Sequence, residues 1–521
     1  MNRFTFMGLL ILVTACDADY TSHSSDVDLD VDDGDAAPGA GGASDTGFDD
    51  GLGSEEENDY QSLRPATTPG YVFVANVERD TISRIAVPSL EVVTAPVGVR
   101  PVSVQAAPTG DKVISFNIGS DDVSIVDAET LDVLTVDVQP SLNQMALSPD
   151  GKWAVLYHDV DAEGASAPLQ QGTISYNEIS VVSLETGAHL EAVVGTFPHD
   201  VVFTEDSSRA VVVSDDYLAM LTLNEDDLDP VRVQLSDDVQ DPPRAEEVVL
   251  APDNRYAFVR QFAVDHLVLV DLLDASIQLL PVGANPTDMD LTPNGDEIVV
   301  VARSAKELWV YDTADPTAPA HVTPLPEDDL YGSVVMLPDA SRGLLYSTQG
   351  GQARYGVWDR TDGTVQTRRL EKPVASLGLS PDGATALVFH TLENGEISPE
   401  SAFYDAEALT IIGLDTFFPN PLKLTAPPLA FANAPDGRTG YFILSGAPYL
   451  GVLDYETIDH TMQPLPSSPT HLGVLPSSNV AFVNQVHSLG RLSFYDPAAL
   501  ENRGAPLQTL TGFELNAEIE R

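Results

Sequence analysis

Short runs of alternating hydrophobic and polar residues recur along most of this chain. A tight turn is followed by a run of alternating aliphatic and aromatic residues, as in Ser-Pro-Asp-Gly-Lys-Trp-Ala-Val-Leu-Tyr from Ser148. Proline and glycine at a turn, followed by period-two alternation, predict a strand that leaves a hairpin. Nine copies of this element, 41 to 56 residues apart, are anchored at Pro108, Pro149, Glu205, Pro252, Pro293, Pro338, Pro381, Pro435 and Pro476.

A second element lies about 20 residues downstream in most copies, and it is an apolar strand that closes on aspartate. An aspartate at a strand end accepts hydrogen bonds from backbone N–H groups two residues on, which stops the strand. With the strands that enter and leave it, each unit has four short strands and no helical pattern, which predicts an all-β propeller blade. The closing residues are Asp127, Asp271, Asp312, Asp359, Asp405, Asp454 and Asp496.

These motifs, together with Tyr71-Val72-Phe73-Val74-Ala75-Asn76, resemble the YVTN family of bacterial β-propeller repeats, whose repeats are similar to those of lactonase-type propellers. The resemblance covers nearly everything after residue 66. The WD40 repeat is a weaker match, because Trp358-Asp359 occurs once and the Gly-His signature of that repeat is missing.

Nine full units, plus a first unit that begins near Pro69 with its second strand, predict a single ring of about ten blades. Seven to ten blades are compatible with the repeats. A smaller ring with divergent insertions and a pair of packed propellers are the alternatives, and the single ring is favoured because no linker separates the repeats. Residues 513–519 form a strand-like run, and we expect them to pair with the N-terminal strands and close the ring.

The N-terminus has the features of a lipoprotein signal peptide over residues 1–15. Its apolar run is too short to span a bilayer, and it ends in Val13-Thr14-Ala15-Cys16, which resembles a bacterial lipobox. Cys16 is the only cysteine, so we expect it to be lipidated and to anchor the chain to a membrane of the bacterial cell envelope. Asp17 resembles an inner-membrane retention signal, and an outer-membrane, periplasmic or surface position stays open.

Residues 16–66 are predicted to be a disordered acidic linker, and residues 67–521 the propeller. Fifteen acidic residues and one base lie between Asp17 and Arg64, a composition that cannot bury enough apolar surface to fold. Residues 26–34 resemble a calcium loop, but their glycine lies at the wrong offset and no bidentate glutamate follows, so a solvated spacer is favoured. The net charge of the whole chain, −55, excludes direct nucleic-acid binding.

Chemistry is expected where propeller loops converge. The connections that enter first strands and those between second and third strands lie on one face of a propeller. His158 and His390 close equivalent second strands, and His199 and His471 open equivalent first strands, so we expect the members of each pair to approach one another. Imidazoles at converging loops can ligate copper, zinc or haem iron, or act as acid–base groups. The polar residues that the sequence places on this face form the candidate ligand-binding rim: Arg100, His158, His199, Asp200, Asp288, Arg303, His390, His471 and His487.

Three functions remain open. A lipid-anchored, monomeric, non-enzymatic propeller would bind a protein, a glycan or a small ligand without a cofactor, and insertions at residues 159–176 and 391–399 would carry recognition. This function is favoured because no Gly-x-Ser-x-Gly, His-Glu-x-x-His, P-loop, Rossmann or Cys-x-x-Cys-His motif occurs. The resemblance to lactonase-type propellers implies a hydrolase with His199, Asp200 and either Arg100 or Arg303 at its site. The third function is a transition-metal protein with a histidine-lined funnel.

Overall fold

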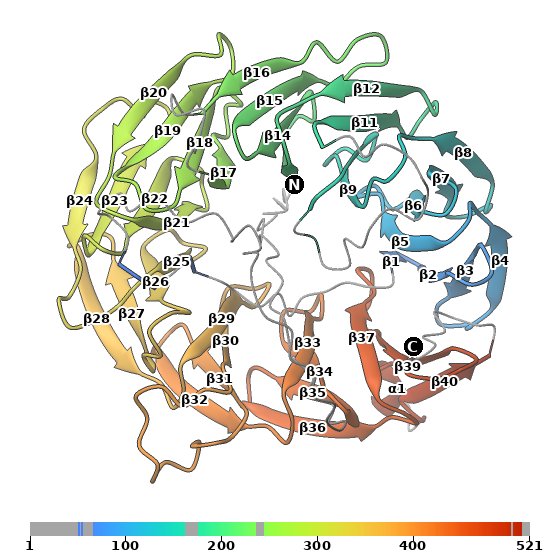
Figure 1. Cartoon of the computed structure of the whole chain (residues 1–521). Coiled ribbons are helices and arrows are strands. Elements are labelled where there is room, and N and C mark those ends of the chain that lie inside the picture. The colour runs from blue at the N-terminus through green and yellow to red at the C-terminus, as the bar shows by residue number, and fades with distance from the viewer. Residues whose placement is uncertain are drawn as a thin grey trace, which may run out of the picture.

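Ten four-stranded antiparallel sheets form a single closed ring in the computed structural model, which describes residues 50–52, 54–55, 66–160, 162, 176–235, 244–501 and 504–512 (Figure 1). Within each sheet the strands follow chain order, with the first strand next to the centre of the ring and the fourth at its perimeter. Each sheet is one blade of a β-propeller. The predicted all-β fold and the count of ten blades are confirmed, in place of a smaller ring or two packed propellers.

The blades are numbered in chain order, four strands to a blade. Blades 1 to 5 contain β1 (Ala66–Thr68), β2 (Tyr71–Asn76), β3 (Thr81–Ala86), β4 (Val92–Pro96), β5 (Pro101–Ala106), β6 (Lys112–Asn117), β7 (Asp122–Asp127), β8 (Val133–Asp137), β9 (Gln144–Leu147), β10 (Trp153–Tyr157), β11 (Glu178–Ser183), β12 (His189–Val193), β13 (Pro198–Phe203), β14 (Arg209–Ser214), β15 (Tyr217–Thr222), β16 (Val231–Gln234), β17 (Ala245–Leu250), β18 (Tyr256–Gln261), β19 (His266–Asp271) and β20 (Ile277–Pro281).

The second half of the ring continues the same order, with one short helix, α1 (Ala498–Glu501), between the last two strands. Blades 6 to 10 contain β21 (Pro286–Leu291), β22 (Glu297–Ala302), β23 (Glu307–Asp312), β24 (His321–Pro324), β25 (Ser333–Met336), β26 (Arg342–Tyr346), β27 (Arg354–Asp359), β28 (Thr364–Arg369), β29 (Val374–Leu379), β30 (Thr385–His390), β31 (Ala408–Gly413), β32 (Phe418–Lys423), β33 (Pro428–Asn433), β34 (Thr439–Leu444), β35 (Ala447–Asp454), β36 (Asp459–Pro464), β37 (Pro469–Val474), β38 (Ala481–Gln485), β39 (Arg491–Tyr495) and β40 (Leu507–Thr511).

The hydrophobic core of the ring lies between blades. Second strands such as β22 are buried on both faces because each blade is covered by a neighbour on either side, whereas fourth strands such as β20 are largely exposed. The described residues form one hydrophobic cluster at each interface between neighbouring blades. Stability therefore comes from ten similar interfaces rather than from one central core.

Ring closure differs from the expectation. β1 fills the innermost position of blade 1 and pairs with β2, a place that the sequence assigned to residues 513–519, which lie outside the described residues. Blade 10 instead packs face to face on blade 1, where Phe482 and Leu492 meet Val72 and Val74. Within the described part of the chain, the ring thus closes by the same hydrophobic packing that joins every other pair of blades.

The repeated turns form as their residues predict. In the turn before β30, the Asp382 Oδ1 atom accepts a hydrogen bond from the Ala384 N–H group at 3.0 Å, and Gly383 takes a left-handed φ of 65°. After β7, the Asp127 Oδ1 atom accepts from the N–H groups of Glu129 and Thr130 at 3.0 and 2.7 Å. These bonds confirm that aspartate ends the strand at this position.

One predicted strand is wrong. The run that ends at Asp405 forms turns, and the third strand of blade 8 is β31, which pairs with β30. Leu409 and Ile411 of β31 are almost fully buried, whereas Phe403 and Tyr404 are only half buried, so β31 contributes more apolar surface to the interface. The connection between β30 and β31 therefore covers residues 391–407 and is longer than expected.

Several predictions concern residues outside the described ranges. They are the signal peptide, Cys16 and Asp17, the resemblance to a calcium loop at 26–34, most of the acidic linker, and residues 161 and 163–175 of the first long loop. No helix within the described ranges is long and apolar enough to cross a membrane.

Candidate functional site

The strand order places the candidate rim on one side of the ring. We call the side that carries the connections into first strands and between second and third strands the loop face, and the opposite side the turn face. Arg100 precedes β5, His158 follows β10, His199 and Asp200 lie in β13, Asp288 lies in β21, Arg303 follows β22, His390 ends β30, His471 lies in β37 and His487 follows β38.

The predicted histidine pairs do not meet. His158 belongs to blade 3 and His390 to blade 8, which are on opposite sides of a ten-bladed ring, and His199 and His471 belong to blades 4 and 10 (Figure 1). Equivalent positions in a repeat are related by rotation about the ring axis, so they converge only when their blades are neighbours. No group of three or more His, Cys, Asp or Glu side chains in the described ranges is placed to hold a metal ion.

His390 is a buried structural residue, with 2% of its surface exposed. Its Nδ1 atom lies 3.0 Å from the Pro373 carbonyl oxygen, which only accepts, so Nδ1 carries the proton. Its Nε2 atom lies 2.7 Å from the Thr410 Oγ1 atom and accepts from that hydroxyl. Burial, helped by the charge of nearby Lys372, lowers the pKa of His390 to about 4.

The other rim histidines also contact their own surroundings. The ring nitrogens of His199 lie 3.2 and 3.0 Å from the carbonyl oxygens of Phe197 and Ala245. His158 Nδ1 lies 2.7 Å from the Ser141 carbonyl oxygen. His471 Nδ1 lies 3.1 Å from Thr470 Oγ1, and His487 Nδ1 accepts from the Leu489 N–H group at 3.1 Å.

The two rim aspartates accept backbone hydrogen bonds. Asp288 Oδ2 accepts from the N–H group of Val334 in the next blade at 2.6 Å. Asp200 Oδ1 accepts from the Val201 N–H group at 2.7 Å, and burial raises the pKa of Asp200. Arg100 precedes blade 2, and its backbone N–H group donates to Asp80 Oδ1 at 2.9 Å. His199 and Asp200 are thus adjacent, while Arg100 and Arg303 belong to other parts of the ring.

Arg303 forms the most elaborate polar site of the rim. Its guanidinium has no exposed surface, and it donates from Nε and Nη2 to the two carboxylate oxygens of Asp50 at 2.8 and 2.9 Å. Its Nη1 atom donates to Glu55 Oε1 at 2.7 Å. Burial opposes the charge of Arg303, but both carboxylates raise its pKa, and the pKa of Asp50 is lowered because the arginine outweighs the cost of burial. The fork of arginine matches a carboxylate in plane and spacing.

Blade 7 completes this site around Glu55. The Ser347 Oγ atom donates to Glu55 Oε1 at 2.8 Å, and the backbone N–H and Oγ1 of Thr348 donate to Glu55 Oε2 at 2.6 and 2.8 Å. A Cβ atom on Gly332 would lie only 1.7 Å from Glu55 Oε1, so the absence of a side chain there makes room for the carboxylate. Gln349 Nε2 donates to the carbonyl oxygen of Ser54 at 2.9 Å.

Sequence patterns did not reveal most of this site. Arg303 was identified, but Gly332 and residues 347–349 carry no recognisable motif, and Asp50 and Glu55 were assigned to a solvated linker. The only available signal was position, because residues 347–349 follow β26 as Arg303 follows β22.

Two further acidic groups near the ring centre were also missed. Glu247 in β17 accepts from Arg260 Nε in β18 at 2.9 Å, and both side chains are largely buried. Asp290 Oδ2 accepts from the Met336 N–H group at 3.0 Å, and burial raises the pKa of Asp290 to about 7. With Asp288, this residue joins the first strands of blades 6 and 7.

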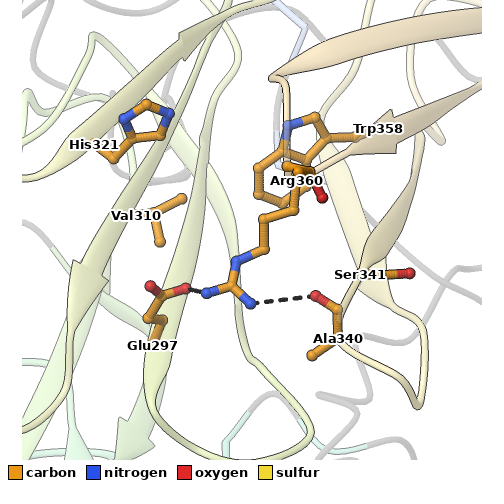
Figure 2. A pocket seen from close by; sticks show the side chains of 8 residues that line it. Glu297, Val310, His321, Ala340, Ser341, Trp358 and Arg360 are labelled. Carbon is orange, nitrogen blue, oxygen red and sulfur yellow. Dashed lines mark hydrogen bonds and ion pairs between the residues drawn. The ribbon is translucent and has the colours of Figure 1, made fainter.

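A separate pocket of about 310 Å³ lies between the same two blades, at the turn face (Figure 2). Arg360 crosses it, forming an ion pair with Glu297 and donating from Nη1 to the Ala340 carbonyl oxygen at 3.2 Å. Trp358 is fully buried in its wall, and the indole N–H group has no hydrogen-bond partner among the described residues. His321 lies on the other side of the pocket (Figure 2).

No protein-family model matches the chain, and no curated protein matches it in sequence. Among solved structures, it is similar to the dihydro-heme d1 dehydrogenase NirN in complex with DHE, at 16% identity over 70% of this chain and 75% of that one, with a TM-score of 0.44. A eukaryotic initiation factor matches at 12% identity over 76% and 97%, with a TM-score of 0.47. The β-propeller domain of Cps50 (Swd1) from Myceliophteria thermophila matches at 14% identity over 57% and 94%, with a TM-score of 0.34. Identities this low concern the fold alone, and on its own strand order the chain is a ten-bladed β-propeller.

Proposed function

We propose that this chain is a lipid-anchored, extracytoplasmic β-propeller that binds a protein, glycan or small ligand through its loop face without catalysing a reaction. The signal-like N-terminus and the single cysteine, Cys16, support the anchor. An acidic linker would hold the ring away from the membrane surface.

The observation that carries the binding role is the uneven distribution of exposed apolar side chains between the two faces. Among the described residues, the connections of the turn face carry two large exposed hydrophobic side chains, Leu273 and Leu500. The connections of the loop face carry five, and they come from several blades: Val99, Val160, Tyr176, Leu392 and Leu489. Exposed apolar side chains that are more numerous on one face, on connections held by a rigid scaffold, favour that face as the interaction surface.

The hydrolase and metal hypotheses lack a comparable observation. A hydrolase of the proposed kind needs His199, Asp200 and an arginine around one point. Asp200 Oδ1 accepts from its own neighbour Val201, and Arg303 is engaged by Asp50 and Glu55. Binding is therefore the function that the described residues support best.

Photo-crosslinking in the native host tests the proposal. A photoreactive amino acid replaces Leu392 on the loop face or, as a matched control, Leu273 on the turn face, since their exposed fractions are 62% and 68%. We expect a discrete crosslinked product from position 392 that is absent from position 273. Equal crosslinking at both positions, or none at 392, would contradict binding through the loop face. The Cys16→Ser variant should move from the membrane fraction to the soluble fraction.

A further inference from the structure

Arg303, Ser347, Thr348 and Gln349 direct hydrogen-bond donors at one occupant, and Gly332 leaves space for it. The guanidinium, two hydroxyl groups, one backbone N–H group and one side-chain amide all point at oxygen atoms of Asp50, Ser54 and Glu55. We call these five residues the Arg303 cluster. A set of donors around a buried arginine binds oxyanions, and the oxyanions found here are the carboxylates of Asp50 and Glu55.

We propose that the Arg303 cluster is a binding site for an acidic peptide segment that presents two carboxylates five residues apart, and that Asp50 and Glu55 occupy it in cis. The inference rests on the proposed function and deepens it, because it names the ligand class of one site on the loop face. In this arrangement the segment around residues 50–55 competes with an external acidic ligand.

The two carboxylates are recognised in different ways. Asp50 receives the fork of Arg303, with Nε and Nη2 each bound to one oxygen. Glu55 receives the third guanidinium nitrogen together with donors from blade 7, and Gly332 leaves the space that its carboxylate fills. Because blades 6 and 7 each supply donors, the cluster fixes both the charge and the spacing of the ligand.

Asp50, Ser54 and Glu55 contact the ring through polar groups that another peptide could reproduce. Leu52 is only half buried, and Ser54 Oγ donates to Glu246 Oε2 at 3.0 Å. A free peptide with the same two carboxylates would make the same bonds. The segment that carries Asp50 and Glu55 belongs to the same chain, so its effective concentration at the site is high. It therefore excludes a weak external ligand until Asp50 and Glu55 are neutralised.

The full-length chain, purified in detergent, tests the proposal with a fluorescein-labelled synthetic peptide of the sequence of residues 48–57. We expect the Asp50→Asn/Glu55→Gln double variant to bind this peptide at least tenfold more tightly than the unsubstituted chain, as followed by fluorescence anisotropy. A peptide with both acidic positions changed to amides should not bind. The Glu225→Gln variant is the matched control, because Glu225 also accepts from a serine and a threonine hydroxyl, at 2.7 and 2.6 Å, but in blades 3 and 4. It should behave like the unsubstituted chain.

Two further variants keep the test decisive. In the double-variant background, Arg303→Lys retains the charge but loses the fork, and Gly332→Ala retains every donor but fills the space of the carboxylate. Each should weaken peptide binding at least tenfold while thermal unfolding still shows a folded ring. If Asp50→Asn/Glu55→Gln does not fold, Glu55→Gln alone replaces it, with the same expected direction.

Peptide affinity that is equal in the double variant and the unsubstituted chain overturns the competition in cis. Affinity that survives both Arg303→Lys and Gly332→Ala overturns the assignment of the site. Either result leaves crosslinking at position 392 unaffected, so failure of this inference is distinguishable from failure of the proposed function.

Discussion

Replacing His390 with glutamine should change how the stability of the ring depends on pH. The imidazole is buried, and both of its hydrogen bonds lie within blade 8: Nδ1 donates to the Pro373 carbonyl oxygen, and Nε2 accepts from the Thr410 hydroxyl. A second proton on Nε2 would reverse the hydrogen bond, so that the Thr410 hydroxyl accepts, and it would place a charge near Lys372, which is itself fully buried. Glutamine offers one donor and one acceptor of similar reach but does not titrate.

The sign and size of the effect follow from the pKa of His390, which falls from 6.5 to about 4 on folding. A depressed histidine pKa contributes stability above pH 6.5, and this stability is lost as the pH falls from 6.5 toward 4, because only the unfolded chain takes up the proton. At pH 4.5 the loss amounts to about 2.5 kcal/mol. Glutamine should cost about 1 kcal/mol at pH 7.5 through poorer hydrogen bonds. The variant should therefore be less stable than the unsubstituted chain at pH 7.5 and more stable at pH 4.5.

Urea unfolding at the two pH values, followed by the fluorescence of the three tryptophans, measures this reversal. Other carboxyl groups titrate in the same range, so the informative quantity is the difference in free energy of unfolding between the variant and the unsubstituted chain. His321→Gln, which removes an exposed imidazole, is the control. Its difference in free energy of unfolding from the unsubstituted chain should be the same at the two pH values. A difference that stays constant within about 0.5 kcal/mol for His390→Gln would refute the reasoning, since 2.5 kcal/mol is predicted from the pKa.

Three other substitutions test the packing of the ring. The pKa of Asp290 is raised from 3.8 to about 7, so its contribution to stability is lost as the pH rises from about 4 to 7. Asp290→Asn should therefore gain about 2.5 kcal/mol relative to the unsubstituted chain between pH 5 and pH 8. A pH-independent difference in urea unfolding would contradict this. Gly383→Ala should lower the free energy of unfolding by about 1–3 kcal/mol, because the residue has a left-handed φ and its Cβ would lie 2.3 Å from Pro338. Gly70→Ala is the control and should cost little, since no atom lies within 4 Å of its Cβ. Equal effects in thermal unfolding would show that neither strain nor crowding matters. Phe482→Ala removes an aromatic ring at the interface of blades 10 and 1. If packing closes the ring of blades, the free energy of unfolding in urea should fall by about 3–5 kcal/mol. A fall below about 1 kcal/mol would mean that closure depends on other contacts.

The blade count was predictable from sequence because each blade carries its own turn chemistry. A Pro-Asp-Gly turn or an aspartate that ends a strand is specified within a few residues, and nine such turns were enough to count ten blades. The run ending at Asp405 shows the limit of this approach. It has the residues of a third strand, but β31 has more apolar surface to bury against its neighbours, and that competition is decided in three dimensions.

The candidate site was predictable only as far as the repeat reaches. Topology predicted that all nine rim residues lie on the loop face, where the strand order places them. It could not say which of them meet, because that depends on the number of blades between them. His158 and His390 occupy equivalent positions and are five blades apart. Asp50 and Glu55 lie outside the repeat altogether, and a contact with a residue about 250 positions later leaves no local pattern.

The interface of blades 6 and 7 shows why the polar sites belong to pairs of blades. Its apolar cluster, which contains Leu308 and Trp358, lies between two polar sites, one on the loop face and one on the turn face. On the loop face, Arg303 of blade 6 shares Glu55 with donors of blade 7, and on the turn face Glu297 of blade 6 pairs with Arg360 of blade 7. Neither site exists in one blade, so a loop that changes in a single repeat alters only half of a site while the apolar cluster holds the other half in place. Recognition at such an interface can therefore diverge without loss of the ring, and it has to be identified from neighbouring blades together rather than from the sequence of any one of them.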